Sequence, residues 1–206
     1  MEDLDPFPED PEATREAIMK ATYRALCEHG YAGLTISRIA EDFEKSKSLL
    51  YHHYDSKDEL LLDFLSFMLE QFERAVPKER ENSADERLEA VFEASLAPKD
   101  DEKRLQFMQA MTELRAQAAH DDRFRAHFTD HDRVFRETIG EILEDGIEEG
   151  TFRDVATEQV ASFLVAALSG GMNLMVTGEK DQEVATIAEL REYVSVRLEA
   201  ESVTQQ

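Results

Sequence analysis

The sequence predicts an all-α protein of nine helices, in which a short three-helix unit precedes a larger helical domain. Three observations predict this fold class. Apolar residues recur at helical spacing through most of the 206 residues. Helix-capping residues, glycines and prolines divide the chain into segments of helical length. No segment shows the two-residue alternation typical of a β-strand.

The first three helices are short and closely spaced. Asp10 and Pro11 are typical of a helix start, and Gly30 is typical of a helix end. Thr35 is the predicted N-cap of the second helix, and Ser46 is that of the third. Helical spacing turns one side of these two short helices toward the core, with Ile36, Ile39, Ala40, Phe43, Leu50 and Tyr54 on it.

The remaining six helices form the larger domain. Two of them open on a capping box, a serine followed three residues later by a glutamate, at Ser56 and Ser83. The next helices are predicted over 101–119, 122–149 and 157–177, and the last one carries Leu190, Val194 and Leu198. Because the segment 157–177 is apolar nearly all round, it needs cover on several sides.

The composition is strongly acidic. Asp and Glu number 46 against 23 Lys and Arg, which gives a formal net charge of -23. The acid is spread along a chain whose apolar residues keep helical spacing, so intrinsic disorder does not account for it. A solvated carboxylate surface of this kind is what we expect of a halophilic protein that works in molar salt. It also argues against binding to anionic membranes.

Cysteine use and the N-terminus indicate a cytoplasmic protein. Cys27 is the only cysteine, which excludes an internal disulfide framework and a Cys-rich zinc site. We find no apolar run of the ~18 residues needed to cross a bilayer. The acidic start Met1–Asp5 lacks the basic-then-apolar plan of a secretory signal.

Two short helices joined by a tight turn and packed beneath a preceding helix form a helix-turn-helix unit. The second helix of such a unit can enter the major groove of double-stranded DNA. The residues expected to meet DNA from this helix are Ser46, Lys47, Ser48, Leu49, Tyr51 and His52. Leu49 is placed to touch a thymine methyl group. The residues expected beside backbone phosphates are Thr35, Arg38, Tyr54 and Lys57.

The run from Ala17 to Leu61 resembles the DNA-binding domain of the TetR family of transcriptional regulators. The matching elements keep the family's spacing without gaps: Gly30-Tyr31, Leu34-Thr35, Ile39-Ala40-Glu41, Ser46-Lys47, Leu50-Tyr51-His52-His53-Tyr54 and Ser56-Lys57-Asp58-Glu59-Leu60. The resemblance implies a helix-turn-helix domain over 11–55 and a ligand-binding and dimerisation domain over 56–200. A disordered acidic lead over 1–10 and a tail over 201–206 would flank them.

The resemblance also implies a mode of action. A homodimer paired through residues 157–200 binds a palindromic operator, and an unknown small apolar or amphipathic effector releases it. Repression is the commoner outcome in the family, with activation as the alternative, and neither a cofactor nor an enzymatic activity is implied. The ligand cavity lies among the middle helices. The residues expected to line it are Phe64, Phe67, Met68, Phe107, Met111, Phe128 and Met172.

Two residues of the turn depart from the family's pattern. Glu44 stands where a glycine is usual, and Lys45 stands where a small apolar residue is common. A non-glycine residue in left-handed backbone costs ~1 kcal/mol. Glu44 is therefore the best support for an alternative interpretation, a helical interaction module that kept the fold without binding DNA.

A second alternative is a metal-dependent enzyme that uses the segment His120–Asp132. His127 and His131 are four residues apart on one helical face, which is a spacing that can present two imidazoles to a metal. A solvated, acid-rich helix start accounts for the same residues. Since no nucleophile–base pair or phosphate loop accompanies them, we expect neither a metal site nor an enzyme.

The predicted DNA-binding stretch is neutral, unlike the rest of the chain. Between Thr35 and Lys57, four cations balance four anions: Arg38, Lys45, Lys47 and Lys57 against Glu41, Asp42, Glu44 and Asp55. At molar salt the Debye length falls to about 3 Å, so repulsion between DNA and the acidic body fades. We therefore predict that operator affinity falls less steeply with salt than it does for a basic DNA-binding protein, or even rises.

Overall fold

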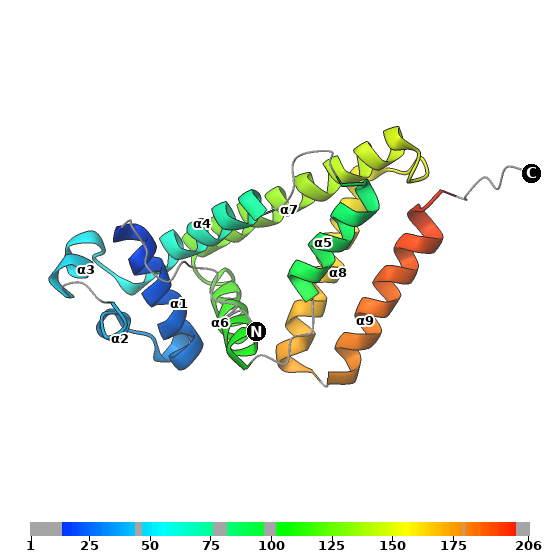
Figure 1. The fold of residues 1–206 in the computed structure, drawn as a ribbon. Helices are drawn as coiled ribbons and strands as arrows, with labels where there is room; N and C mark the ends of the chain where they lie inside the picture. Colours follow the sequence, from blue (N-terminus) through cyan, green and yellow to red (C-terminus); the bar gives the residue numbers. More distant parts are fainter. Residues whose placement is uncertain (1–13, 44–46, 76–81, 97–101, 179, 201–206) are drawn as a thin grey trace, which may run out of the picture. The chain divides into compact units, whose positions relative to one another are not determined.

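The computed structural model describes residues 14–43, 47–75, 82–96, 102–178 and 180–200. Within these ranges the regular structure is helical, apart from one isolated antiparallel bridge between Phe152 and Glu199. This confirms the all-α fold class and the nine helices. In chain order they are α1 (Thr14–Gly33), α2 (Ile36–Ile39), α3 (Lys47–His53), α4 (Lys57–Ala75), α5 (Ala84–Leu96), α6 (Glu102–Gln117), α7 (Asp122–Glu149), α8 (Thr157–Thr177) and α9 (Lys180–Tyr193) (Figure 1).

Two of the predicted helix caps, Thr35 and Ser56, are confirmed. The Thr35 hydroxyl accepts the backbone N–H of Arg38 at 3.2 Å, and α2 begins at the next residue. The Ser56 hydroxyl accepts the backbone N–H of Glu59 at 3.2 Å. The Glu59 carboxylate reaches back to the N–H of Asp55, one residue earlier than in the usual reciprocal box.

Gly30 ends the regular part of α1, as predicted. Its φ of 63° and ψ of 174° are not helical, and its positive φ lies in a region that favours glycine. Several predicted features lie outside the described residues: the lead 1–10, the tail 201–206, Asp10, Pro11, Glu44, Lys45 and Ser46. Strain in the turn at Glu44 therefore stays a prediction.

The chain forms two compact units. The first unit holds the residues up to Phe72 together with Lys99–Phe128, and the second unit holds Glu73–Pro98 together with the residues from Thr129 onward. The unit that contains the short helices thus extends past residue 55, since it takes in most of α4 and all of α6.

α1 is central to the core of the first unit. Its stripe of Ile18, Met19 and Leu26 is buried and packs in one cluster with Ile39 from α2 and Leu50 from α3. Burying a side chain of this size contributes about 1.5–3 kcal/mol relative to leaving it exposed. The core therefore holds both short helices by their inner sides.

The second unit packs α5, α8 and α9 with the C-terminal part of α7. Its buried core includes Leu88, Ile142, Leu164, Leu190 and Leu198. α8 nevertheless leaves apolar side chains in solvent: Phe163 is 48% exposed and Leu174 is 39% exposed. The predicted need for cover on several sides of this helix is not met by its own chain alone.

α8 corrects one expectation from the sequence. Among the described helices, it is long and apolar enough to cross a membrane by length and composition, although we expected no such run. Only 28% of its most apolar stretch is buried within the chain. One helix of this kind is weak evidence for a membrane span, because a core or interface helix meets the same criteria.

Candidate nucleic-acid interface

α3 is fixed from behind by its neighbours in the first unit. Leu50, on the inner side of α3, is completely buried, and Tyr54, the residue after its last turn, is only 9% exposed. The hydroxyl groups of Tyr51 and Ser37 lie 3.0 Å apart and join α3 to α2. A helix of seven residues has little stability of its own, so these contacts set its orientation.

The outer face of α3 carries most of the residues predicted to meet DNA. Lys47, Ser48, Tyr51 and His52 are exposed, with Tyr51 at 52%. Leu49 differs from the prediction, since it is partly buried and packs against the core of the first unit. Removing an apolar side chain from water is favourable, which explains why Leu49 turns partly toward the core. Less of its surface is therefore available to contact a thymine methyl group.

The residues predicted to flank this face have defined partners. Thr35 is exposed and uses its hydroxyl as the α2 cap, while the exposed Arg38 guanidinium donates to the carbonyl of Gly33. Lys57 donates to the carbonyl of Tyr31 at 3.2 Å and lies 4.0 Å from the centre of the Tyr31 ring. The cation at the start of α4 is therefore held in place by the end of α1.

Tyr54 has a protein partner that the sequence did not predict, and its contact with phosphate stays a prediction. It lies on the inner side of α3, as the helical spacing indicates, and its hydroxyl donates to the Asp63 carboxylate at 2.5 Å. Burial and this hydrogen bond raise the pKa of Tyr54 above its ordinary value. The phenol points to Asp63 on α4, and its ring is buried in the core of the first unit.

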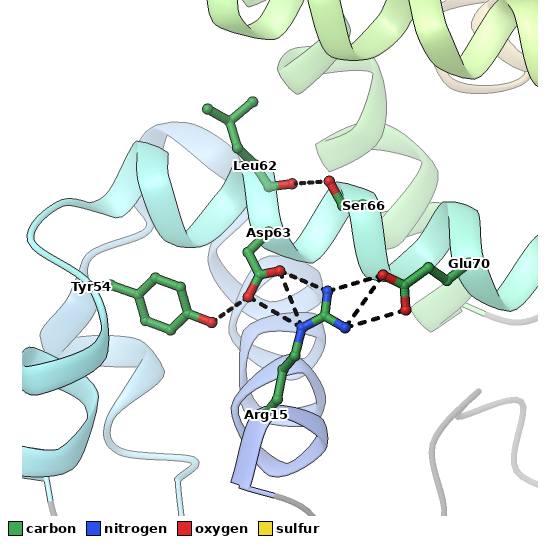
Figure 2. Close-up of polar contacts among 6 residues, drawn as sticks. All are labelled: Arg15, Tyr54, Leu62, Asp63, Ser66 and Glu70. Atoms are coloured by element: carbon green, nitrogen blue, oxygen red, sulfur yellow. Dashed lines mark hydrogen bonds and ion pairs between the residues drawn. The ribbon is translucent and has the colours of Figure 1, made fainter.

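Asp63 belongs to a network that joins three parts of the first unit (Figure 2). Its carboxylate accepts Nη2 of Arg15 at 2.7 Å, and Nη1 of the same guanidinium lies 3.2 Å from the Glu70 carboxylate. The guanidinium carbon also lies 5.3 Å from the centre of the Phe67 ring. Burial alone would raise the pKa of Asp63, but the hydrogen bonds from Arg15 and Tyr54 outweigh it and lower the pKa.

Sequence reasoning missed this network. Arg15 is 48 residues from Asp63 and 55 from Glu70 in the chain, so no local spacing connects them. The available signal is that Asp63 and Glu70 are seven residues apart, which puts both carboxylates on one face of α4.

Glu113 of α6 is a second missed residue. Its carboxylate accepts the backbone N–H of Tyr31 at 2.8 Å, next to the left-handed Gly30. A Cβ at Gly30 would lie 3.3 Å from Glu113 Oε2, so glycine also leaves room for this contact. The end of α1 after Gly30 is thus held by both α4 and α6.

Most of the predicted pocket residues gather in the first unit. Phe64, Phe67 and Phe128 are buried in its core, and Met68, Phe107 and Met111 are partly buried against it. Met172 packs against the core of the second unit. Their role in ligand binding stays a prediction.

The histidine–aspartate segment has structural contacts. His131 Nδ1 lies 3.4 Å from the Asp132 carboxylate, and the His131 ring stacks on Phe135 with the ring centres 4.5 Å apart. Among the described residues, no three His, Cys, Asp or Glu side chains converge to hold a metal ion.

Two family patterns match the chain. Residues 18–64 match the bacterial regulatory proteins of the tetR family, a range that contains the helix-turn-helix unit. Residues 84–201 match the C-terminal domain of BetI-type transcriptional repressors, and this range is more than half of the chain.

Curated relatives resemble the chain over most of its length. The transcriptional repressor AcnR of Corynebacterium glutamicum is 29% identical over 183 residues, which cover 88% of this chain and 92% of that protein. The transcriptional repressor SCO4008 of Streptomyces coelicolor is 27% identical over 163 residues, which cover 78% of each chain.

Solved structures show the same fold. A TetR transcription regulator from Haloarcula marismortui is 32% identical with a TM-score of 0.78, and the match covers 90% of this chain and 98% of that one. A transcriptional regulator from Saccharomonospora viridis in complex with choline is 23% identical with a TM-score of 0.77, and the match covers 91% and 98%. These relatives are regulators by name, in agreement with the expectation that the chain is not an enzyme. The chain belongs to the TetR family of bacterial transcriptional regulators and carries a BetI-type C-terminal domain.

Proposed function

We propose that this regulator is a repressor that binds a roughly palindromic operator as a homodimer and leaves it when a small molecule binds. The observation that carries the proposal is the outer face of α3, where Lys47, Tyr51 and His52 are exposed on a helix whose inner side is buried. Repression is supported by the names of the relatives from Corynebacterium glutamicum and Streptomyces coelicolor. Because it acts on the chromosome, we place the protein in the cytoplasm.

The homodimer is formed through residues 157–200. α8 leaves Phe163 and Leu174 exposed, and the Phe163 ring lies 4.9 Å from that of Tyr193 at the end of α9. A second copy related by a twofold axis would remove this apolar surface from water. Such a dimer carries two α3 helices, which need a separation of about 34–36 Å to reach successive major grooves.

The effector is a small molecule that binds the larger domain, among the aromatic and methionine side chains around Phe64. Met68 and Met111 are flexible and suit an adaptable apolar pocket. The choline complex of the Saccharomonospora viridis regulator makes choline the first compound to try. An effector releases DNA only if it binds the free and DNA-bound conformations unequally.

A gel mobility shift in molar KCl tests the proposal. Duplexes that tile the region upstream of the protein's own gene are compared with shuffled duplexes, with and without choline. We expect one fragment to be retarded selectively. If no fragment is retarded, the repressor function is contradicted and a helical interaction module without DNA binding is favoured. If choline leaves the complex intact, choline is not the effector, and the proposal that the protein binds DNA still stands.

Variants of Tyr51 place the contact on α3. Tyr51→Ala removes the exposed ring and should weaken the shift about ten-fold, the order expected for an anchoring aromatic side chain. Tyr51→Phe keeps the ring and loses the contact with Ser37, so its effect should be smaller. Circular dichroism should show the same helicity for both variants. Equal affinity of Tyr51→Ala and the wild type would move the interface away from this face.

A further inference from the structure

The geometry points to Asp63 as a positioning residue for DNA binding. We infer that its carboxylate fixes the end of α3 relative to α1 and α4 and so sets the angle at which α3 meets DNA. Asp63 itself would not touch DNA. The inference rests on the proposed function, but it concerns how the recognition helix is held.

Asp63 is the acceptor through which α3 joins the network. Tyr54 directly follows the last residue of α3, and its backbone N–H closes on the carbonyl of Leu50 at 3.1 Å. The Tyr54 hydroxyl then donates to Oδ2 of Asp63 on α4 (Figure 2). The C-terminal end of the recognition helix is therefore tied to α4 by a polar contact, in addition to the buried Leu50.

Arg15 orients this carboxylate. Its Nη2 donates to Oδ1 of Asp63 at 2.7 Å, and its Nε lies 3.4 Å from Oδ2, the oxygen that accepts the Tyr54 hydroxyl. The guanidinium therefore holds both oxygens of the carboxylate. Hydrogen bonds in which both partners are charged are strong and directional. Arg15 also binds Glu70, and it would keep that partner if Asp63 were removed. The Tyr54 hydroxyl would instead lose the acceptor that the structure gives it.

The position of this network explains why it should affect DNA binding more than folding. The core that holds the first unit together contains many buried side chains from five other helices. α3 contributes seven residues and enters that core through Leu50. A binding site functions only within about 0.5 Å and 10–20° of the productive geometry. A small change in the angle of α3 thus costs affinity while the core remains packed.

The charge of Asp63 makes two possible roles predict opposite changes in DNA affinity. Asp63 is an anion close to a DNA-binding face in a protein whose net charge is -23, so its removal reduces repulsion of DNA. A purely electrostatic role therefore predicts that Asp63→Ala strengthens binding. A positioning role predicts that it weakens binding. Tyr54→Phe changes no charge and removes only the hydroxyl group that Asp63 accepts.

The experiment measures the dissociation constant for the retarded upstream duplex by fluorescence anisotropy, together with the thermal midpoint. The variants are Tyr54→Phe, Asp63→Ala and the double variant, in the full chain. Each single variant should bind about ten-fold more weakly at a temperature far below its midpoint, since a hydrogen bond to a charged group is lost. The double variant should bind no more weakly than Asp63→Ala, because both changes break the same contact.

Two variants on the same helix serve as controls. Ser66→Ala removes a hydroxyl that donates to the Leu62 carbonyl at 3.0 Å, one turn from Asp63, and should leave affinity unchanged (Figure 2). Glu70→Gln removes one of the two carboxylates that pair with Arg15 and keeps the Asp63–Tyr54 contact. The dissociation constant should therefore change less than two-fold.

Three results would overturn the inference: unchanged affinity of Tyr54→Phe, tighter binding of Asp63→Ala, or a loss in Glu70→Gln as large as that in Asp63→Ala. A lower thermal midpoint with unchanged affinity would show a role in folding only. If the wild-type protein itself binds no fragment, the proposed function fails and the inference fails with it, whereas the results above leave the proposed function intact.

Discussion

Asp63 shows how one side chain connects the stability of the first unit to its binding face. Its carboxylate is held between the Arg15 guanidinium and the Tyr54 hydroxyl, which together lower its pKa. Because the folded-state pKa lies below that of the unfolded chain, the ionised form stabilises the fold. The contribution is complete above about pH 4, the ordinary value for aspartate, and is lost as the pH falls through the lower folded-state pKa.

This linkage gives a prediction in acid. Asp63→Asn lacks the titrating group, so its thermal midpoint should fall less than that of the wild type as the pH drops from about 5 to 2. The two profiles are measured by circular dichroism at one fixed KCl concentration. Parallel profiles would show that Asp63 titrates alike in the folded and unfolded chains.

At this scale the sequence predicts inward and outward directions better than partners. Helical spacing correctly turned Leu50 and Tyr54 inward, because periodicity reports which side of a helix is buried. It did not reveal that the Tyr54 hydroxyl has its partner on α4. Arg15 and Glu113 could not be found from sequence, since their contacts depend on how helices distant in the chain pack together.

At the scale of the elements, local chemistry is a reliable guide to helix boundaries. Thr35 and Ser56 cap helices as predicted, since capping involves residues only three positions apart. The end of α9 was not predicted: it passes into a π-helical turn over Val194–Leu198. There Arg153 donates its N–H to the Leu198 carbonyl at 2.7 Å. A long-range contact of this kind leaves no local sequence signal.

Two glycines of α7 give a matched pair of variants. A Cβ at Gly146 would lie 2.1 Å from Cδ2 of the Phe152 ring, whereas a Cβ at Gly140 would meet nothing within 4 Å. Gly146→Ala should therefore destabilise the fold by about 1–3 kcal/mol through overpacking. Gly140→Ala should stabilise it by about 0.5–1 kcal/mol, because alanine favours a helix interior.

Urea unfolding of both glycine variants measures these free energies. Both variants gain the same helix propensity, so the difference between their free energies of unfolding reports the contact of the Gly146 position with Phe152. If Gly146→Ala is as stable as Gly140→Ala, the close approach of Phe152 to α7 is wrong.

At the scale of the whole molecule, the exposed apolar face of α8 should decide the oligomeric state. Phe163→Glu puts a charge where the ring is 48% exposed in the single chain, so the fold of the monomer should tolerate it. The same charge would be buried in a dimer interface and should destabilise the dimer. We expect the variant to be a folded monomer in sedimentation equilibrium and to lose operator affinity. Leu105→Glu, at a side chain 39% exposed on α6, is the control and should stay dimeric. A dimeric Phe163→Glu protein would place the interface elsewhere.

The net charge of -23 makes a second prediction for the whole molecule. Mutual repulsion of carboxylates destabilises the compact state, and salt screens it. The thermal midpoint should therefore rise from dilute to molar KCl, and operator affinity should fall little or increase over the same range. Full helicity and an unchanged midpoint without added salt would contradict adaptation to brine.

Two copies of α3, paired by twofold symmetry, should bind one operator. Hydroxyl-radical footprinting of the upstream region in molar KCl tests this pairing. We predict a protected site with two half-sites whose centres are one helical turn of DNA, or a multiple of it, apart, and the protection should disappear in Tyr51→Ala. A single unpaired patch of protection, or protection that Tyr51→Ala leaves unchanged, would contradict it.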